Sequence, residues 1–190
     1  MNKLKYLMTI GIMLSVMTVL VACAGKTQVK SDLYIKHAPD WVNEGTNILK
    51  NRNGRLFHGV GSAPAMGDMS LQTSTADNRA RAELARILSS YMEVVSNDYS
   101  SATPTAGEAN SSQSISRQIE NLTRVNLTGS RIIGRWRDKK TDTIYSIAEL
   151  DMKQVKQTLE GVQDMNQGLK QYLTSEGDNI FDRMAEDVRR

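Results

Sequence analysis

Cysteine and histidine are scarce in this chain, which has one cysteine and two histidines in 190 residues. A single cysteine excludes a disulfide within the chain and a metal site built on several thiolates. His37 and His58 lack the four-residue spacing that would place two imidazoles on one helix face. No Gly-x-Ser-x-Gly motif marks a nucleophilic serine. The sequence therefore predicts no catalytic residues, no metal and no cofactor, and we expect a protein that is not an enzyme.

Charge of one sign is not in excess either. The chain has 24 basic and 21 acidic residues, which gives a formal net charge of +3. Two of the basic residues, Lys3 and Lys5, belong to the N-terminal segment, and without them the balance is 22 to 21, or +1. Aromatic residues make up 5% of the chain and do not interleave with a dense basic stretch. Nucleic-acid binding is therefore not expected.

The N-terminal segment has the pattern of an export signal. Lys3 and Lys5 precede an uncharged apolar run from Tyr6 to Leu20, which is about 15 residues long where a membrane-spanning helix needs about 20. The run ends in Leu20-Val21-Ala22-Cys23. Small residues around one thiol resemble the lipobox of bacterial lipoproteins. We therefore predict a signal peptide at 1–22 and lipid attachment at Cys23.

Several expectations follow from this resemblance. The mature chain would run from Cys23 to Arg190, and acyl chains on its first residue would anchor it to a membrane. Ala24 stands where an aspartate often signals retention at the inner membrane, so the resemblance implies the outer membrane. We expect the protein to face the periplasm, although the cell surface stays open. Residues 23–37 are polar and without periodicity, which is typical of a tether.

The remainder of the chain predicts a small α+β domain at 38–160. The strongest periodic signal is a long helix whose apolar residues recur every three or four positions: Ala76, Ala80, Leu84, Ile87, Leu88, Tyr91 and Val95. The predicted elements are a strand at 56–63, a helix at 68–97, a loop at 98–114, a short helix at 115–122, a bent strand at 124–136, a hairpin loop at 138–142 and a strand at 143–150. Asp68 or a nearby serine or threonine is the candidate N-cap of the long helix, and Asp151 is the candidate for the helix after the last strand. This order favours a small antiparallel sheet with the long helix packed on one face.

A helical C-terminal extension is predicted at 161–190, with Gly161, Gly168 and Gly177 as possible breaks. Its apolar residues are candidates for an interface with a partner: Ile180, Phe181, Met184 and Val188. The same spacing also fits a helix that packs back on its own domain. Trp41 is a further candidate interface residue, since tryptophan is enriched at interface hot spots, although packing in the core or on the sheet is the preferred interpretation over an interface or a ligand platform.

The order of several short segments resembles the LPP-twenty lipoprotein family over residues 38–160. The segments are Pro39-Asp40-Trp41-Val42, Gly59-Val60-Gly61-Ser62-Ala63, the helix 76–85, 127–133 with Trp136, and 145–151. The resemblance implies a non-catalytic envelope protein. Some members of the family are flagellar outer-membrane lipoproteins that build rings or disks around the motor and are needed for motility. It therefore implies a homo-oligomer with flagellar basal-body or ring proteins as partners.

Two further hypotheses stay open on the sequence alone. The chain could be a general envelope lipoprotein that binds peptidoglycan, an envelope enzyme or a small ligand. An enzyme is the remaining alternative, and a cluster of buried charged residues would be the structural sign of it.

Overall fold

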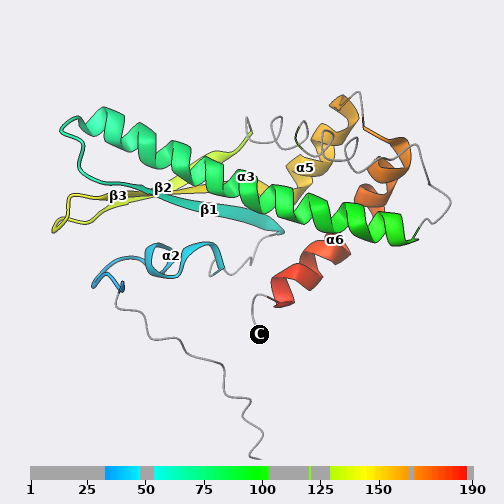
Figure 1. Ribbon diagram of the computed structural model, residues 1–190, viewed down its shortest axis with the longest axis horizontal. Helices are drawn as coiled ribbons and strands as arrows, with labels where there is room; N and C mark the ends of the chain where they lie inside the picture. The colour runs from blue at the N-terminus through cyan, green and yellow to red at the C-terminus, as the bar shows by residue number, and fades with distance from the viewer. Residues whose placement is uncertain (1–32, 48–53, 103–119, 121–128, 163–164, 188–190) are drawn as a thin grey trace, which may run out of the picture. The chain divides into compact units, whose positions relative to one another are not determined.

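The computed structural model describes residues 33–47, 54–102, 120, 129–162 and 165–187. A three-stranded antiparallel sheet carries one long helix on a face, and a C-terminal helix packs beside that helix (Figure 1). The predicted α+β class is confirmed. The elements are α2 (Asp40–Asn43), η1 (Gly45–Asn47), β1 (Leu56–Ala63), α3 (Met69–Ala102), β2 (Arg131–Arg137), β3 (Ile144–Asp151), α5 (Met152–Thr158), η2 (Leu159–Gly161) and α6 (Gln167–Asp187).

The sheet has the order β1-β3-β2, so the last strand in sequence is the central one. β1 pairs with β3 from Leu56 opposite Asp151 to Ala63 opposite Ile144. β2 and β3 form the predicted hairpin, and their register shifts between Ile132 and Gly134. This irregularity lies beside Gly134 and agrees with the bend expected in this strand. β2 begins at Arg131, and the predicted strand residues 124–128 lie outside the described part of the chain.

Helix α3 can lie close to β1 because two residues of that strand have no side chain. A Cβ on Gly59 would lie 2.8 Å from Leu84 Cβ, and one on Gly61 would lie 2.7 Å from Arg79 Cβ. Ala80 between them has no exposed surface. The strand and the helix thus meet through glycine and alanine, which brings their backbones into close contact.

The start of α3 was predicted well and its end was not. Asp68 Oδ1 accepts hydrogen bonds from the backbone N–H groups of Ser70 and Leu71 at 2.8 and 3.1 Å, as an N-cap does. The helix ends at Ala102, so the residues 98–102 that were predicted as loop are helical. Tyr99 explains the difference because it is buried and its ring lies 5.4 Å from that of Tyr172 in α6. Tertiary packing thus extends the helix beyond its apolar pattern.

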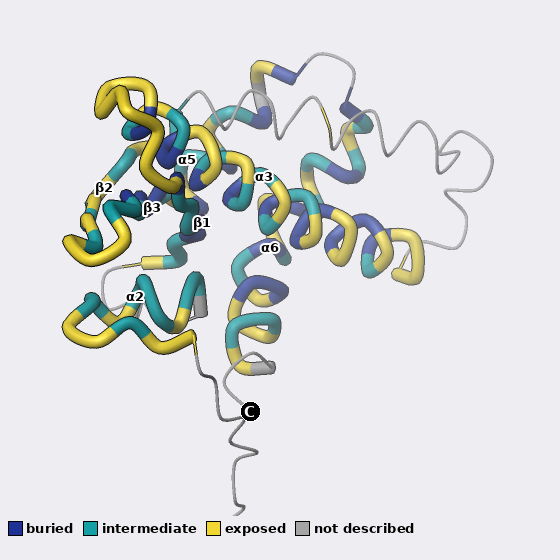
Figure 2. Tube along the Cα trace, turned by 60° about the vertical axis from the view of Figure 1, so that its left-hand side comes forward, coloured by how far each residue is buried: buried dark blue, intermediate teal, exposed yellow. Residues whose placement is uncertain are grey.

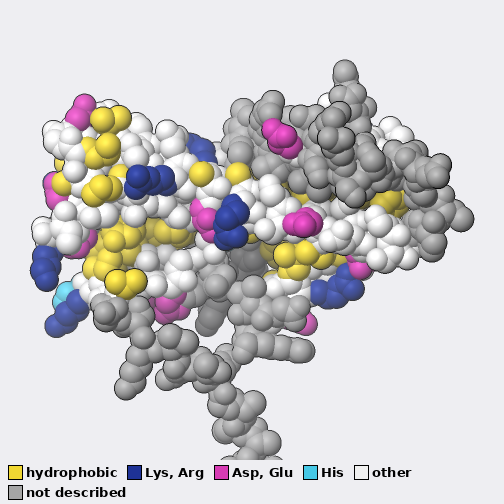
Figure 3. All heavy atoms as spheres, in the orientation of Figure 1, with side chains coloured by type: hydrophobic (Ala, Val, Ile, Leu, Met, Phe, Trp, Pro, Cys, Tyr) yellow, Lys and Arg dark blue, Asp and Glu magenta, His cyan; other side chains and the backbone are white. Residues whose placement is uncertain are grey.

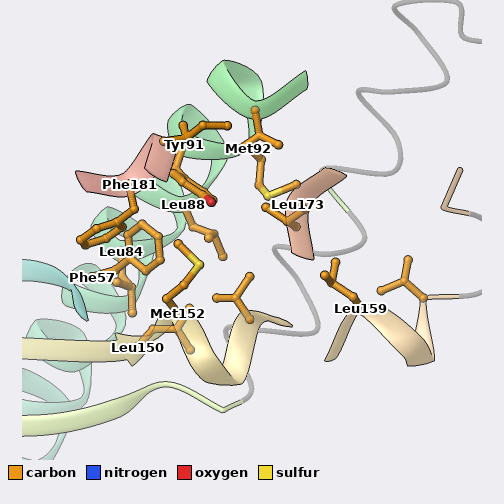
Figure 4. Close-up of a cluster of buried hydrophobic side chains, with 14 of the residues drawn as sticks. Phe57, Leu84, Leu88, Tyr91, Met92, Leu150, Met152, Leu159, Leu173 and Phe181 are labelled. Carbon is orange, nitrogen blue, oxygen red and sulfur yellow. The ribbon is translucent and has the colours of Figure 1, made fainter. Parts of the chain in front are cut away.

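The main core lies where α3, α5 and α6 pack against one end of the sheet, and it includes residues of β1 and β3 (Figures 2 and 4). Phe57, Tyr91 and Phe181 form a three-ring cluster with centroid distances of 5.3, 5.0 and 6.4 Å. Asp151 caps α5 as predicted, since its carboxylate accepts from the N–H of Lys153 at 2.9 Å. Met152 and Val155 of that helix are buried in the same core.

Two of the three glycines predicted as breaks lie inside α6 instead. Gly161 ends η2, but α6 runs without interruption through Gly168 and Gly177. A Cβ on Gly177 would lie 2.8 Å from the hydroxyl oxygen of Tyr91, and one on Gly168 would overlap that of Tyr99. These glycines therefore make room for two tyrosines of α3. The packing outweighs the low helix propensity of glycine, which costs about 1 kcal/mol relative to alanine.

Candidate functional site

Trp41 packs on the face of the sheet opposite α3. Helix α2 lies on that side in both views (Figures 1 and 2), and a Cβ built on Gly134 would lie 4.0 Å from Trp41 Cζ2. The segment is held in a turn by Asn43, whose amide accepts from the N–H of Ile35 at 2.8 Å and donates to its carbonyl at 3.1 Å. Trp41 is half-buried. The structure therefore places this candidate interface residue in sheet packing.

The apolar face of α6 packs on the chain's own core. Ile180 and Phe181 are 1% and 9% exposed, and the half-buried Met184 packs against the same cluster. Val188 lies outside the described residues, as does the lipid-attachment residue Cys23. Of the two interpretations of this helix, the structure favours packing within the domain over a free partner helix.

A cross-strand row of charged and polar side chains lies on the Trp41 face of the sheet. His58 of β1 is paired in register with Glu149 of β3, which is paired in turn with Arg131 of β2. His58 Nε2 lies 3.1 Å from Glu149 Oε2, and Arg131 donates to Glu149 Oε1 at 2.7 Å. The His58 side chain is 5% exposed. Burial lowers the pKa of His58, and its hydrogen bond to Glu149 opposes that change only in part.

A second row lies on the helix face. Arg135 donates to both oxygens of Asp77 in α3, at 2.9 and 2.6 Å. The buried Ser146 hydroxyl donates to Asp77 Oδ1 at 2.7 Å. The hydrogen bonds from Arg135 hold the pKa of Asp77 below its usual value, although burial acts in the opposite direction. These hydrogen bonds connect α3 to β2 and β3.

Ion pairs also connect α6 to the sheet and to α5. Arg55, just before β1, contacts Asp178 at 3.2 Å and Asp182 at 2.6 Å, and Lys156 of α5 contacts Asp178 at 2.8 Å. All four side chains retain solvent exposure between 23% and 51%. Pairs of this exposure contribute little individually, so they orient α6 more than they stabilise it.

These clusters have the geometry of structural clamps. A buried group of charged residues was the sign that would favour an enzyme, and two part-buried groups exist. In both, however, each oxygen of the carboxylate already accepts a hydrogen bond from a side chain of this domain. Neither row was found from the sequence, because His58 and Glu149, like Asp77 and Arg135, are adjacent only once strand register and helix packing are known.

Within the described residues, no group of three or more histidine, cysteine or acidic side chains is placed to hold a metal ion. In that same part of the chain, no helix has the length and apolar character needed to span a membrane. Comparison of the sequence with models of known protein families and with curated proteins finds no match.

Proposed function

We propose that this chain is an acyl-anchored outer-membrane lipoprotein with a non-catalytic structural role, and that it self-associates in a ring or disk of the flagellar motor that is needed for motility. The anchor rests on Cys23 at the end of the N-terminal apolar run. The flagellar role rests on the resemblance to the LPP-twenty family. Flagellar basal-body or ring proteins are the partners that this role implies.

One observation carries the structural character of the role. Two of the segments on which the resemblance depends contact each other in the fold. Gly59 and Gly61 of the Gly-Val-Gly-Ser-Ala segment lie against the helix 76–85, and Arg79 of that helix donates to the Ser62 carbonyl at 2.7 Å. Trp41 lies over Gly134. The packing role of these residues supports the structural role that we propose.

A deletion strain tests the proposal, complemented with the wild-type gene or with Cys23→Ser. We expect loss of swimming, loss of an outer-membrane ring density in images of the motor, and no rescue by Cys23→Ser. Asn78→Ser, at an exposed position of α3, is the matched control and should restore both. Normal swimming with an intact motor in the deletion strain would contradict the flagellar role. Loss of swimming that Cys23→Ser restores fully would contradict the anchor.

A further inference from the structure

One end of the domain exposes apolar side chains that no core residue covers. The connection between β1 and α3 and the first turn of α3 carry three of the exposed large hydrophobic residues: Met66 at 43%, Met69 at 53% and Leu71 at 52%. Pro64 and Ala65 beside them are also exposed. Figure 3 shows hydrophobic side chains gathered at this end, over the start of α3. Three such residues within six positions are more than the scattered single residues of an ordinary surface.

The hairpin between β2 and β3 lies at the same end and is joined to this connection. The buried side chain of Gln72 donates to the Ala63 carbonyl at 3.1 Å and to the Asp142 carbonyl at 2.6 Å. Beneath it, Ala63, Ala76 and Ile144 form a small buried cluster. Residues 64–71 and 138–142 therefore form one structural unit, which we call the loop end.

The acidic and the basic side chains of the loop end differ in what they contact. Its acidic side chains are engaged within the fold. Asp68 caps α3, Asp138 accepts from the Lys140 N–H and the Thr141 hydroxyl at 2.9 and 2.7 Å, and Asp142 pairs with Arg137. Lys139 and Lys140 lie exposed at the tip of the hairpin. Because hydrogen bonding leaves these three carboxylates charged, the loop end has no net positive charge, and its match to an anionic bilayer lies in the exposed apolar side chains and in the two lysines at the hairpin tip.

The described chain begins at Leu33, and residues 33–38 lie toward the end of the domain that carries the hairpin (Figure 1). Leu33 and Tyr34 are themselves 82% and 67% exposed. Ten residue steps separate Cys23 from Leu33, so a chain anchored at Cys23 can hold Leu33 no farther than about 35 Å from the membrane.

We propose that the loop end docks on the surface of the membrane that holds the acyl chains, with Met66, Met69 and Leu71 among the lipid headgroups and Lys139 and Lys140 on anionic phospholipid. The proposal rests on the acyl anchor of the proposed function. It does not depend on the flagellar role. Because the tether raises the local concentration of the loop end, weak contacts with the bilayer are sufficient for docking.

The test uses the full acylated chain in vesicles of phosphatidylethanolamine and phosphatidylglycerol. Met66→Cys carries an environment-sensitive dye, and acylation removes Cys23 from the labelling reaction. Ser101→Cys is the matched control, because it is exposed on the same helix but lies 32 residues from Met69, or about 48 Å along the helix axis. We expect blue-shifted, brighter emission from position 66 and water-like emission from position 101.

A charge variant tests the lysines. Lys139→Gln with Lys140→Gln should lower the ratio of docked to undocked protein about 30-fold, since each lysine near an anionic surface contributes about 1 kcal/mol. Lys153→Gln with Lys170→Gln, on α5 and α6, removes the same charge elsewhere and should leave the ratio unchanged. Equal emission from positions 66 and 101 would overturn the proposal. A shift at 66 that requires added envelope proteins would also overturn it, in favour of a protein partner.

Failure of the anchor is recognised separately, from the mass of the N-terminal peptide. If Cys23 is not acylated, both labelled variants carry a second dye at Cys23, and the difference between them still reports on position 66. A difference that appears on adding anionic vesicles then supports docking without the anchor. The lack of any difference then overturns the proposal together with the anchor on which it rests.

Discussion

Gly59→Ala tests the close contact between β1 and α3 on which the fold depends. The new Cβ would lie within 3.0 Å of three atoms of α3, two of which are backbone atoms, and 2.8 Å from the third, Leu84 Cβ. Neither partner can move aside as the end of a flexible side chain can. The strand and the helix must therefore separate, and Ala80 and Leu84, which have no exposed surface, lose their packing. Overpacking of this kind costs about 1–3 kcal/mol, and we expect the upper part of that range.

Urea unfolding of the purified protein, followed by circular dichroism, measures this loss. With a slope of about 1–3 kcal/mol per molar urea, a loss of about 3 kcal/mol lowers the midpoint by at least about 1 M. Gly161→Ala is the matched control, because its Cβ would meet nothing within 4 Å. We expect the control to stay within about 0.5 kcal/mol of the parent protein. Equal midpoints for the two variants would refute the argument that absent side chains bring strand and helix together.

Three further predictions follow from the core and the two polar rows. Phe181→Asp places a carboxylate among the rings of Phe57 and Tyr91 and should destabilise the protein by about 3–5 kcal/mol or prevent folding. Thermal unfolding would measure this loss, and a folded variant of equal stability would contradict the packing of α6. Asp77→Asn should lower the free energy of unfolding in urea by about 1–3 kcal/mol. Asp142→Asn, in the exposed pair with Arg137, should lower it by less than about 1 kcal/mol. Similar losses in the two variants would argue against a stabilising role of the Asp77 network. Because burial lowers the pKa of His58 below 6.5 in the folded state, its contribution to stability is complete above pH 6.5 and is lost as pH falls through the folded pKa. The free energy of unfolding, measured from pH 7.5 to 5, should therefore fall less steeply in His58→Gln than in the parent protein. Parallel curves for the two proteins would exclude this role.

Local signals predicted much of the fold. The bounds of β1 agree with the prediction at both ends, and the caps at Asp68 and Asp151 were identified from residue type and position. These features depend on interactions a few residues apart. The polar rows depend instead on the register of three strands and on the packing of α3, which no short-range pattern encodes. Asp77 is an example, because its partners Arg135 and Ser146 lie 58 and 69 residues away.

The C-terminal helix shows why an apolar stripe alone does not reveal what it packs against. Ile180, Phe181 and Met184 have the spacing of a helix that buries one face, whether that face meets a partner or the chain's own core. The residues that distinguish a partner from the chain's own core are Gly168 and Gly177, which the sequence analysis treated as possible breaks in the helix. Gly177 receives the hydroxyl of Tyr91, which donates to its carbonyl at 2.9 Å, and Gly168 faces Tyr99.

Tyr91 and Tyr99 are eight residues apart on α3, and Gly168 and Gly177 are nine apart on α6, so both pairs face each other across two antiparallel helices. A glycine at each position allows a tyrosine from the facing helix to lie against the backbone. Once α6 is used in this way, its apolar face is no longer available to another molecule. A partner of the domain is therefore expected to contact other surfaces, and among the described residues the loop end, with Met66, Met69 and Leu71 exposed, is one apolar surface that the fold leaves open.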